Sequence, residues 1–262
     1  MKHPANILFA LVIGAMAAAA EVVPLERAHA HNDYEHERPL LDALDHGFCS
    51  VEADINLVDG ALLVAHSRRE TKPGRTLEAL YLEPLKQRIE KNGGRVYRNS
   101  DAQFWLLIDI KGSGQATWPV LNNVLKQYKD MLTSYKGKKV KPGPVSVVVD
   151  NADRDIAAEK VRYAAIDGRL RHLEQDMPVE LMPWVSSSWS DVFSWKGDGE
   201  MPAEEREKLR EIVKKTHDQG RKLRFWALPR PWVVWPVLYE EGVDFLNADA
   251  LDKLRDFLLE QK

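Results

Sequence analysis

The sequence predicts an α/β fold, a single-domain (β/α)8 barrel of the TIM type. Eight strand candidates alternate with helix candidates along 262 residues, counting one short hairpin with its parent strand. This alternation over this length is typical of the barrel, and a doubly wound parallel sheet is the alternative. Polar residues close most of the strand candidates, which indicates one polar mouth at their C-terminal ends. No linker-like stretch, internal repeat or low-complexity segment divides the chain.

The strands are predicted from runs of apolar residues or from alternation of apolar and polar residues, which is the period of a strand. The clearest case is SVEADINL at residues 50–57, and Asp59-Gly60 after it signals a hairpin into residues 61–66. FWLLIDIK and VSVVVD are two further clear strands, at residues 104–111 and 145–150. The remaining candidates are residues 26–31, 163–166, 180–185, 221–228 and 243–247.

The helices are predicted from apolar residues at helical spacing together with start and stop residues. Pro39 in the first turn and Gly47 after the last turn bound a helix over residues 38–46, and Gly93-Gly94 ends one over residues 75–92. Residues 138–143 are a polar connection, and residues 186–199 fit neither period, so that segment is either a lid or a packed loop. The other predicted helices are residues 115–135, 153–162, 203–219, 232–241 and 250–260.

The N-terminus predicts export. Lys2 and His3 precede an apolar run over residues 7–20 that ends in small residues, as in a secretory signal peptide. Cleavage near Ala20 would leave a mature domain of residues 21–262, located in the periplasm or outside the cell. An uncleaved N-terminal anchor is the alternative.

Composition excludes several classes of protein. The formal net charge is −3, and the one basic run, KGKKVK at residues 136–141, is too short to make nucleic acid the main partner. The single cysteine, Cys49, excludes a disulfide framework and a cysteine-rich zinc site, and its apolar neighbours favour a buried, inert thiol.

Acidic residues at strand ends predict a metal site. Glu52 and Asp54 share one face of the strand at residues 50–57, and Asp109 closes the next strand. Carboxylates that lose hydration next to one another need a neutralising cation, and oxygen ligands suit Mg²⁺ or Ca²⁺. Three carboxylates, a dication and Lys111 sum to zero charge, so the site can accept the single negative charge of a phosphodiester.

Histidines lie on both sides of this acidic strand. His31 ends the strand candidate before it, and His66 ends the hairpin after it. Phosphodiester cleavage needs one group to take a proton from the nucleophile and another to protonate the leaving oxygen, and histidine does both near neutral pH. His29 shares strand parity with His31 and could replace or orient it.

The spaced pattern His31, Glu52-x-Asp54, His66 and Asp109-x-Lys111 resembles the phosphatidylinositol-phospholipase-C-like phosphodiesterase superfamily. That superfamily includes glycerophosphodiester phosphodiesterases and sphingomyelinase D. The wording HNDY, SVEADINL and LLVAH is most similar to the branch named for altered inheritance of mitochondria protein 6. The specific part of the resemblance covers residues 28–111.

The resemblance implies a TIM barrel, Mg²⁺ or Ca²⁺ on Glu52, Asp54 and Asp109, and catalysis by His31, His66 and Lys111. Two departures bear on the substrate: Asn32 stands where glycerophosphodiester phosphodiesterases usually have arginine, and Ser67 stands where they usually have aspartate. The residues expected to line the substrate mouth are His29, Asn32, Asp150, Asp167, Trp226 and Asn247.

We therefore expect a secreted, metal-dependent phosphoric diester hydrolase or cyclising lyase, monomeric, acting on a small-molecule or lipid phosphodiester. A non-catalytic barrel that binds an extracellular polar ligand is one alternative. A glycoside hydrolase is a third, although its two carboxylates would face one another across a sugar rather than share a strand. For a lipid substrate, Trp189 and Trp195 are candidates for membrane contact, and packing between barrel and helices is the alternative for both.

Overall fold

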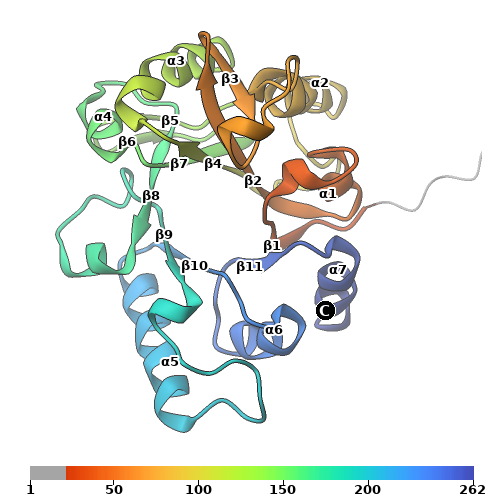
Figure 1. Ribbon diagram of the computed structural model, residues 1–262, viewed down its shortest axis with the longest axis vertical. Helices are drawn as coiled ribbons and strands as arrows, with labels where there is room; N and C mark the ends of the chain where they lie inside the picture. Colours follow the sequence, from red (N-terminus) through yellow and green to blue (C-terminus); the bar gives the residue numbers. More distant parts are fainter. Residues whose placement is uncertain (1–21) are drawn as a thin grey trace, which may run out of the picture.

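The computed structural model describes residues 22–262 and forms a nearly closed barrel of eight parallel strands with helices around it (Figure 1). The predicted fold class is therefore confirmed. The barrel strands are β1 (Leu25–Ala30), β2 (Phe48–Val58), β4 (Phe104–Lys111), β7 (Val145–Asp150), β8 (Ala165–Arg169), β9 (Trp184–Ser188), β10 (Lys222–Trp226) and β11 (Leu246–Ala248).

The strands follow one another around the barrel in chain order. The parallel pairs run from β10 through β9, β8, β7, β4 and β2 to β1, and β11 pairs with the other side of β1. A parallel bridge between Arg224 and Phe245 closes the ring between β10 and β11. Strand β3 (Ala61–Val64) pairs antiparallel with the end of β2, as the Asp59-Gly60 signal predicted.

Helices occupy the connections outside the barrel and differ widely in length. The longest are α3 (Gly114–Gln127) and α5 (Ala203–Asp218), and the connection between β8 and β9 has only a 3-10 turn, η4 (Leu170–Glu174). The other α-helices are α1 (Leu41–Asp45), α2 (Glu83–Lys91), α4 (Asp153–Ala158), α6 (Pro231–Glu240) and α7 (Leu251–Glu260).

The two faces of each strand have different roles. On β2, Val51, Ala53 and Ile55 are fully buried in the large apolar core. Glu52 and Asp54 alternate with them, and Glu52 reaches the pocket described below. A smaller interior cluster lies inside the barrel and is built from aromatic and aliphatic side chains, namely Trp105, Leu107, Tyr135, Val148, Ala165, Trp184 and Phe245.

One predicted helix was too long. Helix α3 ends at Gln127, and a two-stranded hairpin of β5 (Ser134–Lys136) and β6 (Lys139–Lys141) follows instead of more helix and a polar connection. Gly137, with φ of 56°, takes the turn between the two short strands. Tyr135 explains the change, because it inserts into the interior cluster, a long-range contact that local periodicity does not report.

Two predicted strands were displaced toward the C-terminus. Strand β8 runs through Asp167-Gly168-Arg169, beyond the predicted end at residue 166, and β9 continues into the serines at 186–188. The polar residues are tolerated inside because Ser186 Oγ donates a hydrogen bond to Asp167 Oδ1 at 2.7 Å. The rest of the 186–199 segment is a packed loop, since Trp189 and Trp195 are buried.

The first two predicted helices were also longer than the real ones. Helix α1 begins only at Leu41, because Leu40 has a positive φ of 64°. The second region opens with Thr76 in a bridge to Leu63 and a π-helical turn, η3 (Glu78–Leu82), before α2 begins.

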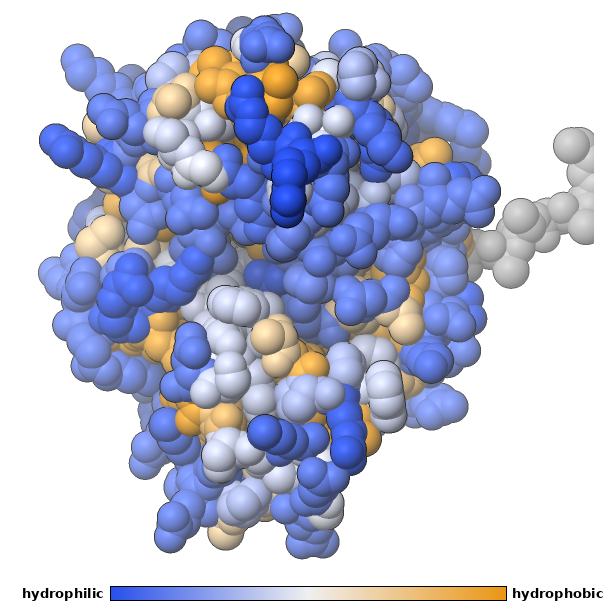
Figure 2. Space-filling view, in the orientation of Figure 1, coloured by the Kyte–Doolittle hydropathy of each residue, from blue (hydrophilic) through white to orange (hydrophobic). Residues whose placement is uncertain are grey.

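The predicted signal peptide, residues 1–20, lies outside the described residues. Within residues 22–262 no helix is long and apolar enough to cross a membrane. On the face seen in Figure 2, hydrophilic residues predominate and the hydrophobic residues form scattered patches.

The inserted hairpin supplies a test of the packing. Replacing Tyr135 by Ala should lower the free energy of unfolding by about 3–5 kcal/mol, because a buried aromatic side chain is lost from the barrel interior. Replacing Val140 by Ala on the same hairpin should change it by less than about 0.5 kcal/mol, because Val140 is exposed. Urea unfolding of both variants measures the difference, and equal stabilities would contradict the assignment of Tyr135 to the core.

Candidate active site

A pocket of about 210 Å³ opens at the C-terminal ends of the barrel strands. Most of the residues predicted from the sequence meet in it, and they come from six of the eight barrel strands or from the turns that follow them, and from the turn after β3. The lining residues are His31, Asn32, Glu52, His66, Leu107, Asp109, Lys111, Asp150, Asp167, Arg169, Arg224 and Trp226.

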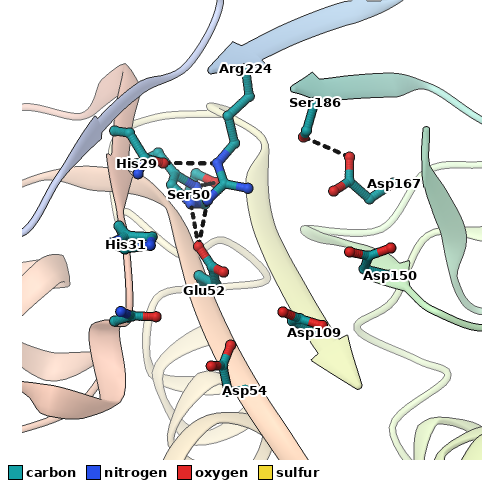
Figure 3. A network of polar contacts seen from close by, with 12 residues as sticks. His29, His31, Ser50, Glu52, Asp54, Asp109, Asp150, Asp167, Ser186 and Arg224 are labelled. Carbon is teal, nitrogen blue, oxygen red and sulfur yellow. Dashed lines mark hydrogen bonds and ion pairs between the residues drawn. The ribbon is translucent and has the colours of Figure 1, made fainter. Parts of the chain in front are cut away.

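Three carboxylates form a compact group at one side of this pocket. Glu52, Asp54 and Asp109 each offer an oxygen within 4.8 Å of the others. The parallel register of β2 and β4 explains the grouping, because it places Asp54 directly opposite Asp109. Figure 3 shows the same row of carboxyl groups continuing to Asp150 and Asp167 on the next two strands.

The two oxygens of Asp54 have different surroundings. Oδ2 accepts hydrogen bonds from Tyr34 Oη at 2.8 Å and from Lys111 Nζ at 2.9 Å, and lies 3.0 Å from His66 Nδ1. Oδ1 is buried and has no hydrogen-bond partner in the protein. A buried carboxylate oxygen without a donor costs free energy, and a bound cation would remove that cost.

The pKa values of the group point the same way. Burial, together with the negative charge of Glu52, raises the pKa of the Asp54 carboxyl. Burial also raises the pKa of Asp109, and the Lys111 ammonium only partly opposes it. A divalent cation among these oxygens would stabilise their ionised forms, so the donor set fits Mg²⁺ or Ca²⁺.

Glu52 is held by a separate set of polar side chains beneath the pocket. Arg224 Nη2 donates to Glu52 Oε2 at 2.5 Å, and His29 Nε2 lies 3.4 Å from the same oxygen (Figure 3). Burial by itself would raise the pKa of Glu52, but the Arg224 guanidinium and His29 hold it below its ordinary value. Arg224 Nε donates in turn to Asn247 Oδ1 at 2.8 Å.

His29 and Asn247 were predicted to line the substrate mouth, but the structure places both outside the pocket lining. His29 is fully buried, its Nδ1 lies 2.7 Å from Ser50 Oγ, and burial beside Arg224 lowers its pKa to about 3. Neutral His29 and Asn247 thus support Glu52 and Arg224 from below.

Each of the two predicted acid–base histidines contacts a carboxylate through Nδ1. His66 Nδ1 lies 3.0 Å from Asp54 Oδ2, and His31 Nδ1 lies 2.7 Å from Asp249 Oδ1. In each ring a carboxylate therefore fixes the proton on Nδ1, which leaves Nε2 for proton transfer in the pocket. The hydrogen bond from His31 lowers the pKa of Asp249.

Local backbone structure brings each histidine to its partner. The hairpin of β2 and β3 ends with Ala65 N donating to Asp54 O at 3.1 Å, which places the next residue, His66, beside Asp54. His31 N donates to Ala248 O at 3.0 Å, which places its ring beside Asp249.

Cationic side chains balance the acids around the pocket. Lys111 Nζ lies 2.6 Å from Asp109 Oδ2 as well as contacting Asp54. Arg169 pairs with Asp150 and, at 3.0 Å, with Asp167 Oδ2, while about a quarter of its side chain stays exposed. Burial raises the pKa of Asp167 to about 7 despite Arg169.

Sequence reasoning missed four residues of this site: Tyr34, Arg169, Arg224 and Asp249. Arg169 and Arg224 were detectable in principle, because each shares strand parity with a predicted pocket residue two positions away, Asp167 and Trp226. Asp249 follows a strand end directly. Tyr34 had no such signal, because it reaches Asp54 from a loop.

The loop between β1 and α1, which carries Tyr34, is held in place by a buried carboxyl group. Asp33 Oδ2 accepts from Leu40 N at 2.6 Å and from Tyr81 Oη at 2.9 Å, whereas Oδ1 has no partner. Asn32 has a positive φ of 46° and accepts from Tyr34 Oη at 3.0 Å. The pinned loop thus positions Asn32 and Tyr34 over the carboxylates.

Comparison with known sequences identifies relatives over nearly the whole chain. Residues 16–166 match the model of the AIM6-like phosphodiesterase domain. Altered inheritance of mitochondria protein 6 of Eremothecium gossypii is 32% identical over 93% of this chain and 72% of its own length. The homolog of that protein in Arthroderma benhamiae is 29% identical over 90% of this chain and 84% of its own length.

Solved structures share the fold at low sequence identity. A glycerophosphodiester phosphodiesterase from Parabacteroides distasonis is similar with a TM-score of 0.53 and 13% identity, over 90% of this chain and 97% of that one. A phosphodiesterase from Oleispira antarctica, solved with the product sn-glycerol-3-phosphate, has a TM-score of 0.51 and 15% identity, over 89% and 96% of the two chains.

Asp33 gives this site a measurable pH dependence of stability. Burial raises its pKa to about 7, from 3.8, so between these values the folded chain binds a proton that the unfolded chain releases. Stability from this group is therefore lost as pH rises, by about 2.6 kcal/mol between pH 5 and pH 8. Urea unfolding should show this loss in the wild type and in the exposed control Asp130→Asn, but not in Asp33→Asn. Parallel pH profiles for all three would contradict it.

Proposed function

The chain belongs to the AIM6-like phosphodiesterase family, and we propose that it is an exported, metal-dependent enzyme that cleaves a phosphodiester. The observation that carries the proposal is a carboxylate oxygen without a hydrogen-bond partner, Asp54 Oδ1, beside a pocket lined by two carboxylate-bound histidines. Export rests on the apolar run at residues 7–20.

Glu52, Asp54 and Asp109 would hold the cation, Mg²⁺ or Ca²⁺. When bound, such an ion polarises a phosphoryl oxygen and stabilises the charge that develops on it. Lys111 contacts two of these carboxylates and keeps them oriented toward the pocket. The positive charge of its ammonium would also attract an incoming anion toward this group of carboxylates.

Glycerophosphodiester phosphodiesterases usually have an arginine where this chain has Asn32, and Arg169 is our candidate for the phosphate-binding arginine in its place. Its guanidinium lines the pocket, is oriented by two carboxylates, and remains partly exposed. Planar guanidinium groups bind phosphate oxygens through two parallel hydrogen bonds. Arg224 is less suited to this role, because it is buried and committed to Glu52 and Asn247.

His31 and His66 would divide the proton transfers between them. One Nε2 takes the proton from the attacking hydroxyl, and the other gives a proton to the leaving alkoxide. Asp249 and Asp54 stabilise whichever ring is protonated at that moment. The attacking hydroxyl is either water or a neighbouring hydroxyl of the substrate, and the second case yields a cyclic phosphate.

Replacing His31 or His66 by Ala should lower kcat/KM for bis(p-nitrophenyl) phosphate by about 10²–10⁴-fold, because each variant loses one proton-transfer group. His46→Ala, at a histidine outside the pocket, is the matched control and should keep full activity. This diester has no neighbouring hydroxyl, so a second assay with a β-hydroxyalkyl diester separates hydrolysis from cyclisation. A fully active double variant would end the catalytic assignment. Absence of turnover by the wild type across a panel of diesters would favour the ligand-binding alternative.

Metal removal tests the carboxylate group independently of turnover. Mg²⁺ or Ca²⁺ added to EDTA-treated protein should stabilise it by about 2.7 kcal/mol at one hundred times the dissociation constant. Asp54→Asn and Asp109→Asn should lose most of this stabilisation, and the exposed control Asp176→Asn should keep it. Calorimetric titration and thermal unfolding measure the effect, and equal metal affinity in all four proteins would place the ion elsewhere.

A further inference from the structure

Two neighbouring connections at the end of the barrel opposite the pocket are rich in positive charge. Residues 86–101 and 126–144 connect α2 to β4 and α3 to β7, so both stretches lead into the N-terminal ends of barrel strands. Together they contain eleven lysines and arginines and only three aspartates and glutamates, in a chain whose net charge is −3. We call these two stretches the basic face.

The two stretches enter neighbouring strands, and the second stretch contacts the chain just after the first. Gln103 Nε2 donates to Gly143 O at 3.2 Å, and Phe104 N donates to Pro144 O at 3.3 Å. A pocket of about 460 Å³ borders the first stretch, and its lining combines the start of the described chain, Val22–Pro24, with Arg88, Lys91 and Arg98. No carboxylate is among the residues that line it.

The hairpin of β5 and β6 presents its charges from a fixed base. Tyr135 is buried in the barrel, exchanges two backbone hydrogen bonds of 2.9 Å with Arg162, and packs under the Arg162 guanidinium. Beyond this anchor the chain is exposed, and Val140 is 45% exposed among lysines. The hairpin carries four lysines, Lys136, Lys138, Lys139 and Lys141. None of them makes an ion pair with a carboxylate among the described residues.

We propose that the basic face docks on an anionic lipid bilayer and that the phosphodiesterase pocket consequently opens away from that bilayer. Clusters of four to eight lysines and arginines next to a hydrophobic segment are attracted to anionic headgroups, with about 1 kcal/mol for each cation. The apolar run of residues 7–20 precedes Val22 in the sequence, and Val22 lines the pocket of about 460 Å³ that borders the basic face.

A bilayer suits this surface better than a nucleic acid does. Single-stranded nucleic acids are held by exposed aromatic rings as well as cations, but Tyr97 and Tyr135 are buried and Tyr128 is half-buried. Val23 and Val140 are exposed hydrophobic residues beside these charges, and they suit the interfacial region of a membrane. The inference does not require the chain to be an enzyme, because lipid binding is measured without turnover.

The test is co-sedimentation of the full chain with phosphatidylcholine vesicles that contain either no anionic lipid or about 30 mol % phosphatidylglycerol. The test variant replaces the four hairpin lysines by Gln: Lys136→Gln, Lys138→Gln, Lys139→Gln and Lys141→Gln. The matched control replaces four lysines outside the basic face, with the same change of net charge: Lys196→Gln, Lys208→Gln, Lys214→Gln and Lys253→Gln.

The expected result is binding that requires the anionic lipid and weakens as salt rises from about 0.1 M to about 0.5 M. The partition coefficient should fall on the order of 1000-fold in the hairpin variant and less than about threefold in the control. Neutral vesicles show any contribution of the apolar N-terminal segment. Equal losses in the two variants, or binding that ignores lipid charge, would overturn the proposal. Tighter binding of a single-stranded oligonucleotide through the same lysines would assign the surface to nucleic acid instead.

Lysine acetylation measures the orientation of the protein on the vesicle. In vesicle-bound protein, Lys138 and Lys139 should be protected from acetylation, while Lys196 and Lys253, outside the basic face, should react as they do in free protein. Mass spectrometry of the labelled peptides measures both pairs. Protection of the second pair instead of the first would reverse the proposed orientation.

Discussion

Two like charges placed side by side are the constraint around which the active-site end of the barrel is built. The register of β2 and β4 sets Asp54 directly against Asp109, and like charges in that position destabilise a sheet. Their surroundings answer this repulsion at Asp54 Oδ2 with Tyr34, Lys111 and His66, and leave Oδ1 without a donor. A fold selected only for stability would have little reason to keep such an oxygen, which is why we interpret it as a ligand position.

The pairing of acids with bases explains how the pocket can hold many ionised groups. Each acid that lines the pocket is paired with a base, either from another strand, such as Glu52 with Arg224, or from its own, such as Asp109 with Lys111. Buried ion pairs of this kind add little net stability, because desolvation offsets their attraction. What they supply is fixed orientation, and the two histidines receive it in the same way through Asp54 and Asp249. Orientation of charged groups before substrate arrives is what electrostatic catalysis requires.

The sequence predicted the barrel, the carboxylate group and the histidine pair because each depends on local pattern. Alternation on β2 and β4 and the Asp59-Gly60 turn determine where Glu52, Asp109 and His66 point. The groups it missed act across the barrel: Arg224 meets Glu52 at a separation of 172 residues, and Asp249 meets His31 at 218. His29 and Asn247 were misplaced for the related reason that strand parity gives the face of a residue but not its depth. The displaced β8 and β9 also depend on a distant partner, the hydrogen bond between Ser186 and Asp167.

The two ends of the barrel have been free to specialise separately because the interior between them is solid. Trp184 and Phe245 lie with ring centroids 4.4 Å apart in the interior, and Tyr135 packs in the same cluster. Packed layers of this kind transmit little change from one end to the other unless they rearrange, so we expect substitutions on the exposed part of the hairpin to have little effect on the pocket. A connection at the pocket end could not carry four unpaired lysines without altering the charge balance that Asp54 and Asp109 depend on. At the opposite end the packed interior of the barrel separates the same lysines from the charged groups of the pocket. Their charge can therefore attract an anionic bilayer.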